Sequence, residues 1–149
     1  LEACEELRND IDATIVLVGG ATDDEPDVSH AGVLRVESCS APHLAGLYQN
    51  AELVFLLGTN RGVPLRVLEA MRAGAPMVAP QDGTITEYAG KAPIFYNADS
   101  LESLRRAVRR VRDESPQART GRLRPAQQKA REYTWEKSAW KLLQAMERT

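Results

Sequence analysis

The chain has 149 residues, 43% of them hydrophobic, with 19 basic and 21 acidic side chains and a formal net charge of −2 at pH 7. This length suits one domain with an apolar core, and the near-balanced charge says little about partners. No apolar run approaches the roughly 20 residues of a transmembrane helix, and no signal peptide is visible, so we expect a cytoplasmic protein.

The residue types that most often bind metals are isolated in this sequence. Cys4 and Cys39 fit no metal-binding or redox spacing and are predicted to be reduced thiols. His30 and His43 also lack ligand spacing. The sequence therefore predicts no metal site.

The first half of the chain alternates helical and strand patterns. A helical pattern over residues 1–7 is followed by an apolar strand at 13–18 that runs into a Gly-Gly turn. Residues 21–31 are acidic and irregular, which predicts a solvated loop, and residues 32–36 form a short strand. Apolar residues at helical spacing over 44–51 predict a crossover helix.

The second half continues the alternation. Residues 53–57 are a buried apolar strand, followed by a glycine-containing turn at 58–62 and a helix that begins at Pro64 and ends at Gly74. After them we expect, in order, a strand at 76–80, a loop at 81–85, a short helix, an edge strand at 92–96, and helices at 101–114, 116–132 and after Thr134. This alternation predicts an α/β fold with a doubly wound, parallel, Rossmann-like sheet.

The strand, glycine turn and helix from residue 53 to Gly74 predict a ligand site. Such a turn directs backbone N–H groups, at the positive end of a helix, towards an anion, and ligands bind beyond the strand ends of such sheets. Leu65 and Arg66 would offer backbone N–H groups to a diphosphate, and Arg66 a charge-assisted contact. Glu69, deeper in the helix, could accept hydrogen bonds from ribose hydroxyls. The sequence therefore predicts a binding site for a nucleotide diphosphate.

Residues 60–74 read Asn-Arg-Gly-Val-Pro-Leu-Arg-Val-Leu-Glu-Ala-Met-Arg-Ala-Gly. This stretch resembles the signature of the retaining glycosyltransferase family four, the group 1 glycosyltransferases of GT-B fold. The family pattern is Asn-Glu-Gly-x-Pro-x-x-x-x-Glu-Ala-Met-x-x-Gly. The resemblance continues through residues 76–79 and 82–87, and residues 133–136 resemble the family's Phe-Ser-Trp-Glu. It therefore covers nearly the whole chain in the right order.

The resemblance implies the donor-binding domain of an enzyme that moves a sugar from a nucleotide diphosphate donor to a hydroxyl acceptor. It implies no metal or other cofactor, because the nucleotide sugar is itself a substrate. It also places Gly83 and Thr84 near the donor sugar or phosphate. The predicted substrate-binding residues are Gly62, Pro64, Leu65, Arg66, Glu69, Gly83 and Thr84.

Arg61 departs from the family pattern, which has a glutamate near the donor sugar at this position. We assign Arg61 as the catalytic candidate, although a guanidinium repels the positive charge of an oxocarbenium-like sugar unless it is neutralised. Three interpretations stay open. Arg61 binds an acidic sugar or the diphosphate, or it points away while another group serves. Alternatively, the domain has lost transferase activity and is a degenerate, non-catalytic nucleotide-binding or scaffolding module.

The resemblance also predicts the domain organisation. The family's first strand, its diphosphate-binding arginine and lysine, and its acceptor-binding N-terminal domain have no counterpart here. We expect an incomplete Rossmann-like domain over residues 1–133, the C-terminal half of a GT-B enzyme without its first strand and inactive by itself. The helix at 134–149 is expected to pack toward the missing N-terminal domain, with packing on its own sheet as the alternative. Its apolar face consists of Ala139, Trp140, Leu143 and Met146.

A basic tract with ten arginine and lysine side chains lies between residues 105 and 131. It could attract anionic lipid, so a peripheral membrane contact stays open as a second localisation. It has no interleaved aromatic residues for base stacking, and we expect no nucleic acid partner. A solvated helical face, compensated by the acidic first thirty residues, is the simpler interpretation.

Overall fold

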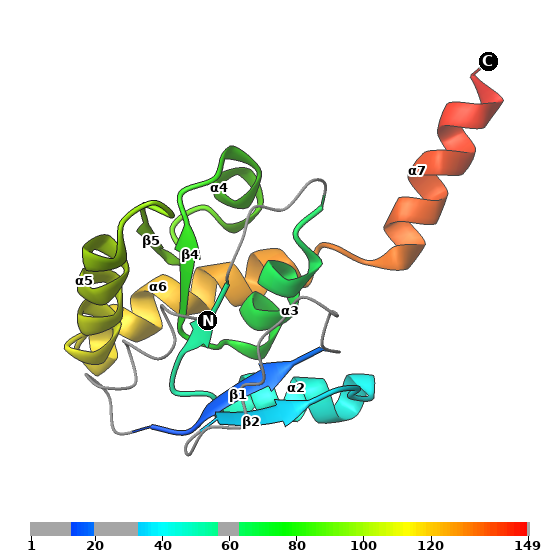
Figure 1. Ribbon diagram of the computed structural model, residues 1–149. Helices are drawn as coiled ribbons and strands as arrows, with labels where there is room; N and C mark the ends of the chain where they lie inside the picture. Colours follow the sequence, from blue (N-terminus) through cyan, green and yellow to red (C-terminus); the bar gives the residue numbers. More distant parts are fainter. Residues whose placement is uncertain (1–12, 20–32, 57–62, 149) are drawn as a thin grey trace. The chain divides into compact units, whose positions relative to one another are not determined.

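The structure is a computed structural model that describes residues 13–19, 33–56 and 63–148. The chain divides into two compact units, Leu1–Gly46 and Leu47–Thr149. In the described residues, parallel strands alternate with helices, as predicted for a doubly wound α/β fold (Figure 1).

The first unit contains a parallel pair of strands, β1 (Ile15–Val18) and β2 (Val33–Val36), which pair over their whole length. Gly19 follows β1 with a φ of 138°, a conformation that favours glycine. Its N–H donates to the Val36 carbonyl at 3.0 Å, which extends the pairing beyond the last strand residue. Helix α2 (Ala41–Asn50) begins in this unit and ends in the second.

The second unit contains a three-stranded parallel sheet in the order β3 (Val54–Phe55), β4 (Met77–Pro80) and β5 (Ile94–Tyr96). Every residue of the central strand β4 is buried, which fits its uninterrupted apolar pattern. Pro80 lies at the end of β4, as predicted. β5 is an edge strand among the described strands, which confirms the prediction made from Pro93.

Helix α3 (Leu65–Ala73) turns an apolar side, which includes Val67 and Met71, into the core. Pro64 is the N-cap of α3 and not its first helical residue, so the predicted start was wrong by one position. Proline fits there because its nitrogen has no hydrogen to donate and its φ of −80° suits the approach to a helix.

Gly74 ends α3, as predicted, with a φ of 75° in the left-handed region. Its N–H donates to the Met71 carbonyl, and the next N–H, from Ala75, donates to the Ala70 carbonyl, both at 3.0 Å. These two bonds form a Schellman motif, which satisfies carbonyl groups at the helix end.

Helix α4 (Gly83–Ala89) begins where the sequence predicted a loop over residues 81–85. Asp82 is its N-cap, and Asp82 Oδ1 accepts hydrogen bonds from the N–H groups of Thr84 at 2.9 Å and Ile85 at 3.1 Å. The predicted loop was wrong because this cap draws Gly83 and Thr84 into the first helical turn.

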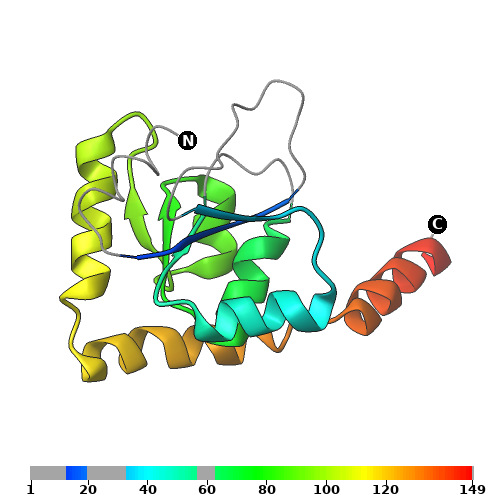
Figure 2. The same cartoon turned by 60° about the horizontal axis from the view of Figure 1, so that its bottom comes forward.

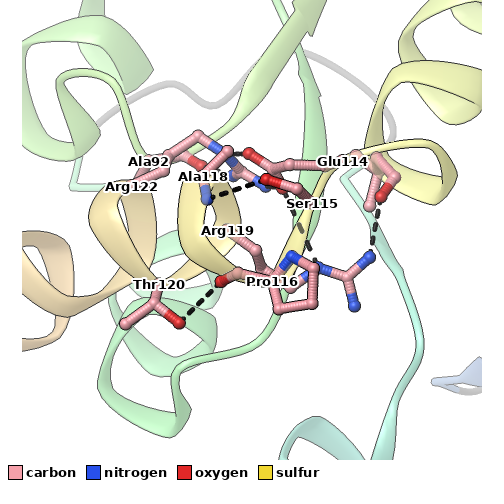
Figure 3. Close-up of polar contacts among 9 residues, drawn as sticks. Ala92, Glu114, Ser115, Pro116, Ala118, Arg119, Thr120 and Arg122 are labelled. Atoms are coloured by element: carbon pink, nitrogen blue, oxygen red, sulfur yellow. Dashed lines mark hydrogen bonds and ion pairs between the residues drawn. The ribbon is translucent and has the colours of Figure 1, made fainter.

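Helices α5 (Leu101–Arg112) and α6 (Pro116–Ala130) meet at a corner held by charged side chains (Figure 3). Arg122 of α6 donates to both carboxylate oxygens of Glu114 and to the Ala92 carbonyl. Arg119 donates to the carbonyl of Val111, in the last turn of α5, at 2.8 Å. These contacts fix the direction in which α6 leaves α5.

Helix α6 packs against α3 (Figure 2). Leu123, Ala126 and Ala130 are its buried residues. The Gln127 amide nitrogen donates to the Arg72 carbonyl at 3.1 Å, so a side chain of α6 binds the last turn of α3. The core of the unit therefore includes α3 and α6 together with the sheet.

Helix α7 (Trp135–Glu147) begins at the predicted cap, where the Thr134 hydroxyl accepts a hydrogen bond from the Lys137 N–H at 3.2 Å. No residue of α7 is buried, and Trp140 is 62% exposed. The apolar side chains of α7 are therefore exposed in this chain. No helix in the described part of the chain is both long and apolar enough to span a bilayer.

Candidate functional site

The carboxyl ends of β3, β4 and β5 lie at one edge of their parallel sheet, and α3 and α4 start from this edge. Side-chain and backbone bonds join the ends of the strands. The O–H of Tyr96, at the end of β5, donates to the Leu56 carbonyl after β3 at 3.2 Å. The Gln81 N–H after β4 donates to the Tyr96 carbonyl at 2.8 Å. These two hydrogen bonds therefore join the carboxyl ends of β3, β4 and β5 to one another.

Glu69, in the second turn of α3, accepts two hydrogen bonds on one carboxylate oxygen. Arg66 Nη1 donates to Glu69 Oε2 at 3.2 Å, in an ion pair whose side chains are 60% and 42% exposed. The O–H of Tyr48, in the last turn of α2, donates to the same oxygen at 3.3 Å. Neither bond uses Oε1, so the second carboxylate oxygen is not committed to these two partners.

Burial and the charge of Glu69 keep the Tyr48 phenol protonated, and Glu69 keeps Arg66 protonated. Burial, followed by the negative charge of Glu69, raises the pKa of the Tyr48 phenol above its ordinary value. Partial burial lowers the pKa of Arg66, but the charge and hydrogen bond of Glu69, with smaller contributions from Tyr48, outweigh it and raise that pKa overall. Near neutral pH, Glu69 therefore faces one cationic donor and one neutral donor.

The start of α3 has a tight turn in front of it. The Leu65 N–H donates to the Val63 carbonyl at 2.9 Å around Pro64, whose φ of −80° and ψ of 73° are those of an inverse γ-turn. Pro64 itself is fully buried. A diphosphate that used the Leu65 N–H would have to open or share this bond.

Gly83 and Thr84 form the first turn of α4 at the same edge of the sheet. The N–H groups of Thr84 and Ile85 already donate to Asp82, so a donor sugar would contact Gly83 and the Thr84 hydroxyl in preference to these two groups. A Cβ atom added to Gly83 would meet nothing within 4 Å. The fold alone therefore does not require a glycine at this position.

The structure places Arg66 and Glu69 together, and Pro64 and Leu65 at the start of the same helix. Gly83 and Thr84 start α4, which packs against α3. Arg61 and Gly62 lie outside the described residues. In the part of the chain that is described, no three histidine, cysteine, aspartate or glutamate side chains gather as a metal ion would require.

The sequence did not point to Tyr48 as part of this cluster. Its spacing marked it only as one apolar position of a crossover helix. Tyr48 and Glu69 are 21 residues apart, and no short motif connects them. Only the tertiary structure brings the phenol, in the last turn of α2, to the carboxylate on α3.

The model of the family described as glycosyl transferases group 1 matches residues 1–114. The chain belongs to the group 1 glycosyltransferases. A search of curated proteins by sequence found no match to this member of the family.

Solved structures agree with this family fold. This glycosyltransferase chain superposes on sucrose-phosphate synthase from Thermosynechococcus elongatus with a TM-score of 0.82 and 19% identity, over 99% of this chain and 41% of that one. A trehalose-phosphate synthase from Burkholderia multivorans gives a TM-score of 0.72 at 12% identity, over 97% of this chain and 38% of that one. A UDP-forming trehalose-phosphate synthase from Burkholderia xenovorans gives a TM-score of 0.70 at 13% identity, over 88% of this chain and 36% of that one.

These similarities show the fold, which is that of the C-terminal domain of a GT-B glycosyltransferase. The glycosyltransferase chain spans less than half the length of each of these three structures.

Proposed function

We propose that this chain is the donor-binding part of a retaining glycosyltransferase that moves a sugar from a nucleotide diphosphate to a hydroxyl acceptor. The acceptor would bind to a domain outside the chain, and α7 would pack toward that domain. By itself the chain would bind the nucleotide without turnover. The solved structures to which it is similar are named as sucrose-phosphate and trehalose-phosphate synthases, one of them UDP-forming, which fits this class of donor.

The observation that carries the proposal is the position of Glu69. Its carboxylate lies on α3, the helix that starts at the carboxyl edge of the sheet, and its side chain is 42% exposed. A carboxylate oxygen accepts hydrogen bonds from two adjacent hydroxyl groups, which is what a ribose presents. It cannot bind a phosphate directly, so the anion must contact other groups.

Arg66 supplies a group of that kind. It lies one turn closer to the start of α3 than Glu69 and is 60% exposed, so its guanidinium can contact an anion while it stays paired with Glu69. The pair also lowers the repulsion between the carboxylate and an incoming diphosphate. The positive end of α3 acts in the same direction.

The test is calorimetric titration of the full-length protein with UDP, GDP and ADP. We expect at least one of them to bind, and Glu69→Ala to weaken its binding about tenfold or more, which corresponds to the loss of about 1.4 kcal/mol. Glu52→Ala is the matched control. Glu52 is also an exposed glutamate, but it lies just before β3, at the opposite edge of the sheet.

Two results would contradict the proposal. The first is that none of the three nucleotides binds. The second is that Glu69→Ala and Glu52→Ala leave the affinity equally unchanged, which would exclude Glu69 from the ribose site.

The second candidate function is a degenerate module that binds nucleotides or partners without catalysis. The sequence observation that favours it is Arg61, in place of the first glutamate of the family motif. Arg61→Glu in the full-length protein separates the two candidates. A gain in transfer from the donor would indicate lost activity, whereas a loss would show that the enzyme uses this arginine.

A further inference from the structure

We propose that Tyr48 is the positioning residue of Glu69: its phenolic O–H holds one carboxylate oxygen so that the other faces the ribose hydroxyls. This inference rests on the proposed function, because it assigns Tyr48 a role at the same site. The juxtaposition that carries it is the 3.3 Å bond from the Tyr48 O–H to Glu69 Oε2, made between two different helices.

Tyr48 is anchored in a way that Arg66 is not. Its ring is half-buried and packs against the hydrophobic core of the second unit, which includes Leu68 of α3. Arg66 is 60% exposed and lies on the same helix as Glu69. A long exposed side chain retains many rotamers, whereas a packed tyrosine ring directs its O–H along one line. The direction of the carboxylate is therefore set by Tyr48.

The two donors have different effects on the carboxylate. Arg66 brings a positive charge, which partly neutralises Glu69. Tyr48 is neutral, because burial and the nearby carboxylate raise the pKa of its phenol, so it orients Glu69 without cancelling its charge. Both bonds use Oε2, and Oε1 is the oxygen that would accept from the ribose.

The experiment measures sugar recognition in the full-length protein. The nucleoside diphosphate that binds among UDP, GDP and ADP is compared with its 2′,3′-dideoxy form, which lacks both ribose hydroxyls. The ratio of the two affinities reports the hydroxyl contacts alone. Four variants are compared with the wild type, namely Tyr48→Phe, Glu69→Gln, the double variant, and Tyr88→Phe.

Tyr48→Phe keeps the ring in the core and removes only the O–H. We expect it to lower the preference for the ribose form about three- to tenfold. In the Glu69→Gln background the same change should cause no further loss, because the two residues act through one contact. Tyr88 is the matched control, since it is a half-buried tyrosine packed against the same core, with its ring next to Tyr133.

The outcomes distinguish this inference from the proposed function. If Glu69→Gln lowers the preference but Tyr48→Phe does not, the inference is wrong and the proposed function stands. The inference is also wrong if Tyr48→Phe weakens both nucleotides equally, or if Tyr88→Phe has the same effect, because either result indicates a structural role only. If the wild type shows no preference for the ribose form, or if none of the nucleotides binds, the ribose site itself is wrong.

Discussion

Arg122 binds both carboxylate oxygens of Glu114, with Nε at 2.8 Å from Oε1 and Nη2 at 2.6 Å from Oε2. The two side chains are only 13% and 12% exposed, so the pair is largely removed from water. A guanidinium in this two-bond geometry is among the strongest charge-assisted contacts in proteins. Because Arg122 also donates to the Ala92 carbonyl, the pair connects the α5–α6 corner to the segment before β5.

The first prediction concerns the stability of this corner. Glu114→Gln leaves the Arg122 charge mostly buried without its carboxylate, and we expect the free energy of unfolding to fall by about 2–3 kcal/mol. Urea unfolding followed by far-UV circular dichroism measures it. Glu147→Gln, on the exposed helix α7, is the control and should change stability by less than about 0.5 kcal/mol. Equal effects of the two variants would show that the pair contributes little.

The second prediction concerns the free energy of unfolding at acidic pH. The hydrogen bond from Arg122, aided by the charges of Arg122, Arg119 and Arg110, lowers the pKa of Glu114, against the opposing effect of burial. A lowered folded-state pKa gives stability that is fully present above the ordinary glutamate pKa of about 4.3 and is lost as the pH falls from there toward the folded-state pKa. The free energy of unfolding of Glu114→Gln should therefore fall less steeply below about pH 5 than that of the wild type. If the free energies of unfolding of both proteins fall in parallel as the pH is lowered, the lowered pKa of Glu114 does not contribute to stability.

The third prediction concerns the end of α3. Gly74 has a φ of 75°, and a Cβ atom there would lie 3.3 Å from the Gln127 amide nitrogen. Gly74→Ala should therefore lower stability by about 1–2 kcal/mol, the usual cost of the left-handed conformation for a residue with a Cβ. Gly83→Ala is the control, because a Cβ there meets no atom within 4 Å and φ is not positive. Thermal unfolding of the two variants should differ clearly.

The fourth prediction uses Gly83 at the site. The glycine is not needed for folding, so Gly83→Ala should melt at the wild-type temperature. If the donor sugar or phosphate approaches the first turn of α4, the added methyl group should lower the affinity for a nucleotide sugar more than that for the nucleoside diphosphate. Titration with both ligands measures the difference. An unchanged affinity for both would remove Gly83 from the site.

The fifth prediction concerns Arg66. Its ion pair with Glu69 is exposed, so Arg66→Ala should cost less than about 1 kcal/mol of stability. The affinity of the Arg66→Ala variant for the nucleoside diphosphate should nevertheless fall. Its affinity for the corresponding nucleoside, which has no phosphate, should change less. Equal losses for the two ligands would indicate that Arg66 acts only through Glu69.

The arrangement of strands and helices could be predicted from the sequence because the ends of these elements are set by individual residues. Gly74 had to end a helix, Thr134 could cap the last helix, and the proline before β5 marked an edge strand. The errors were local too. The start of α4 was misplaced because residues 81–85 were expected to form a loop, although the Asp82 carboxylate caps a helix in which Gly83 is the first residue.

The candidate site was predictable only in part. Arg66 and Glu69 came from one short motif, and the structure brings their side chains together. Tyr48 could not be predicted, because its contact with Glu69 is a tertiary contact across 21 residues that no short motif indicates. The Leu65 bond to Val63 was also missed, because Pro64 was expected inside the helix and not in a γ-turn before it.

The two tryptophans of the chain, Trp135 and Trp140, both belong to α7, where they are 79% and 62% exposed. Intrinsic tryptophan emission therefore reports the surroundings of this one helix and hardly depends on the sheet. A denaturation curve recorded by that signal would describe α7 and not the core. Conversely, a shift of the emission to shorter wavelength on adding a second polypeptide would reveal that α7 has been covered, without any labelling.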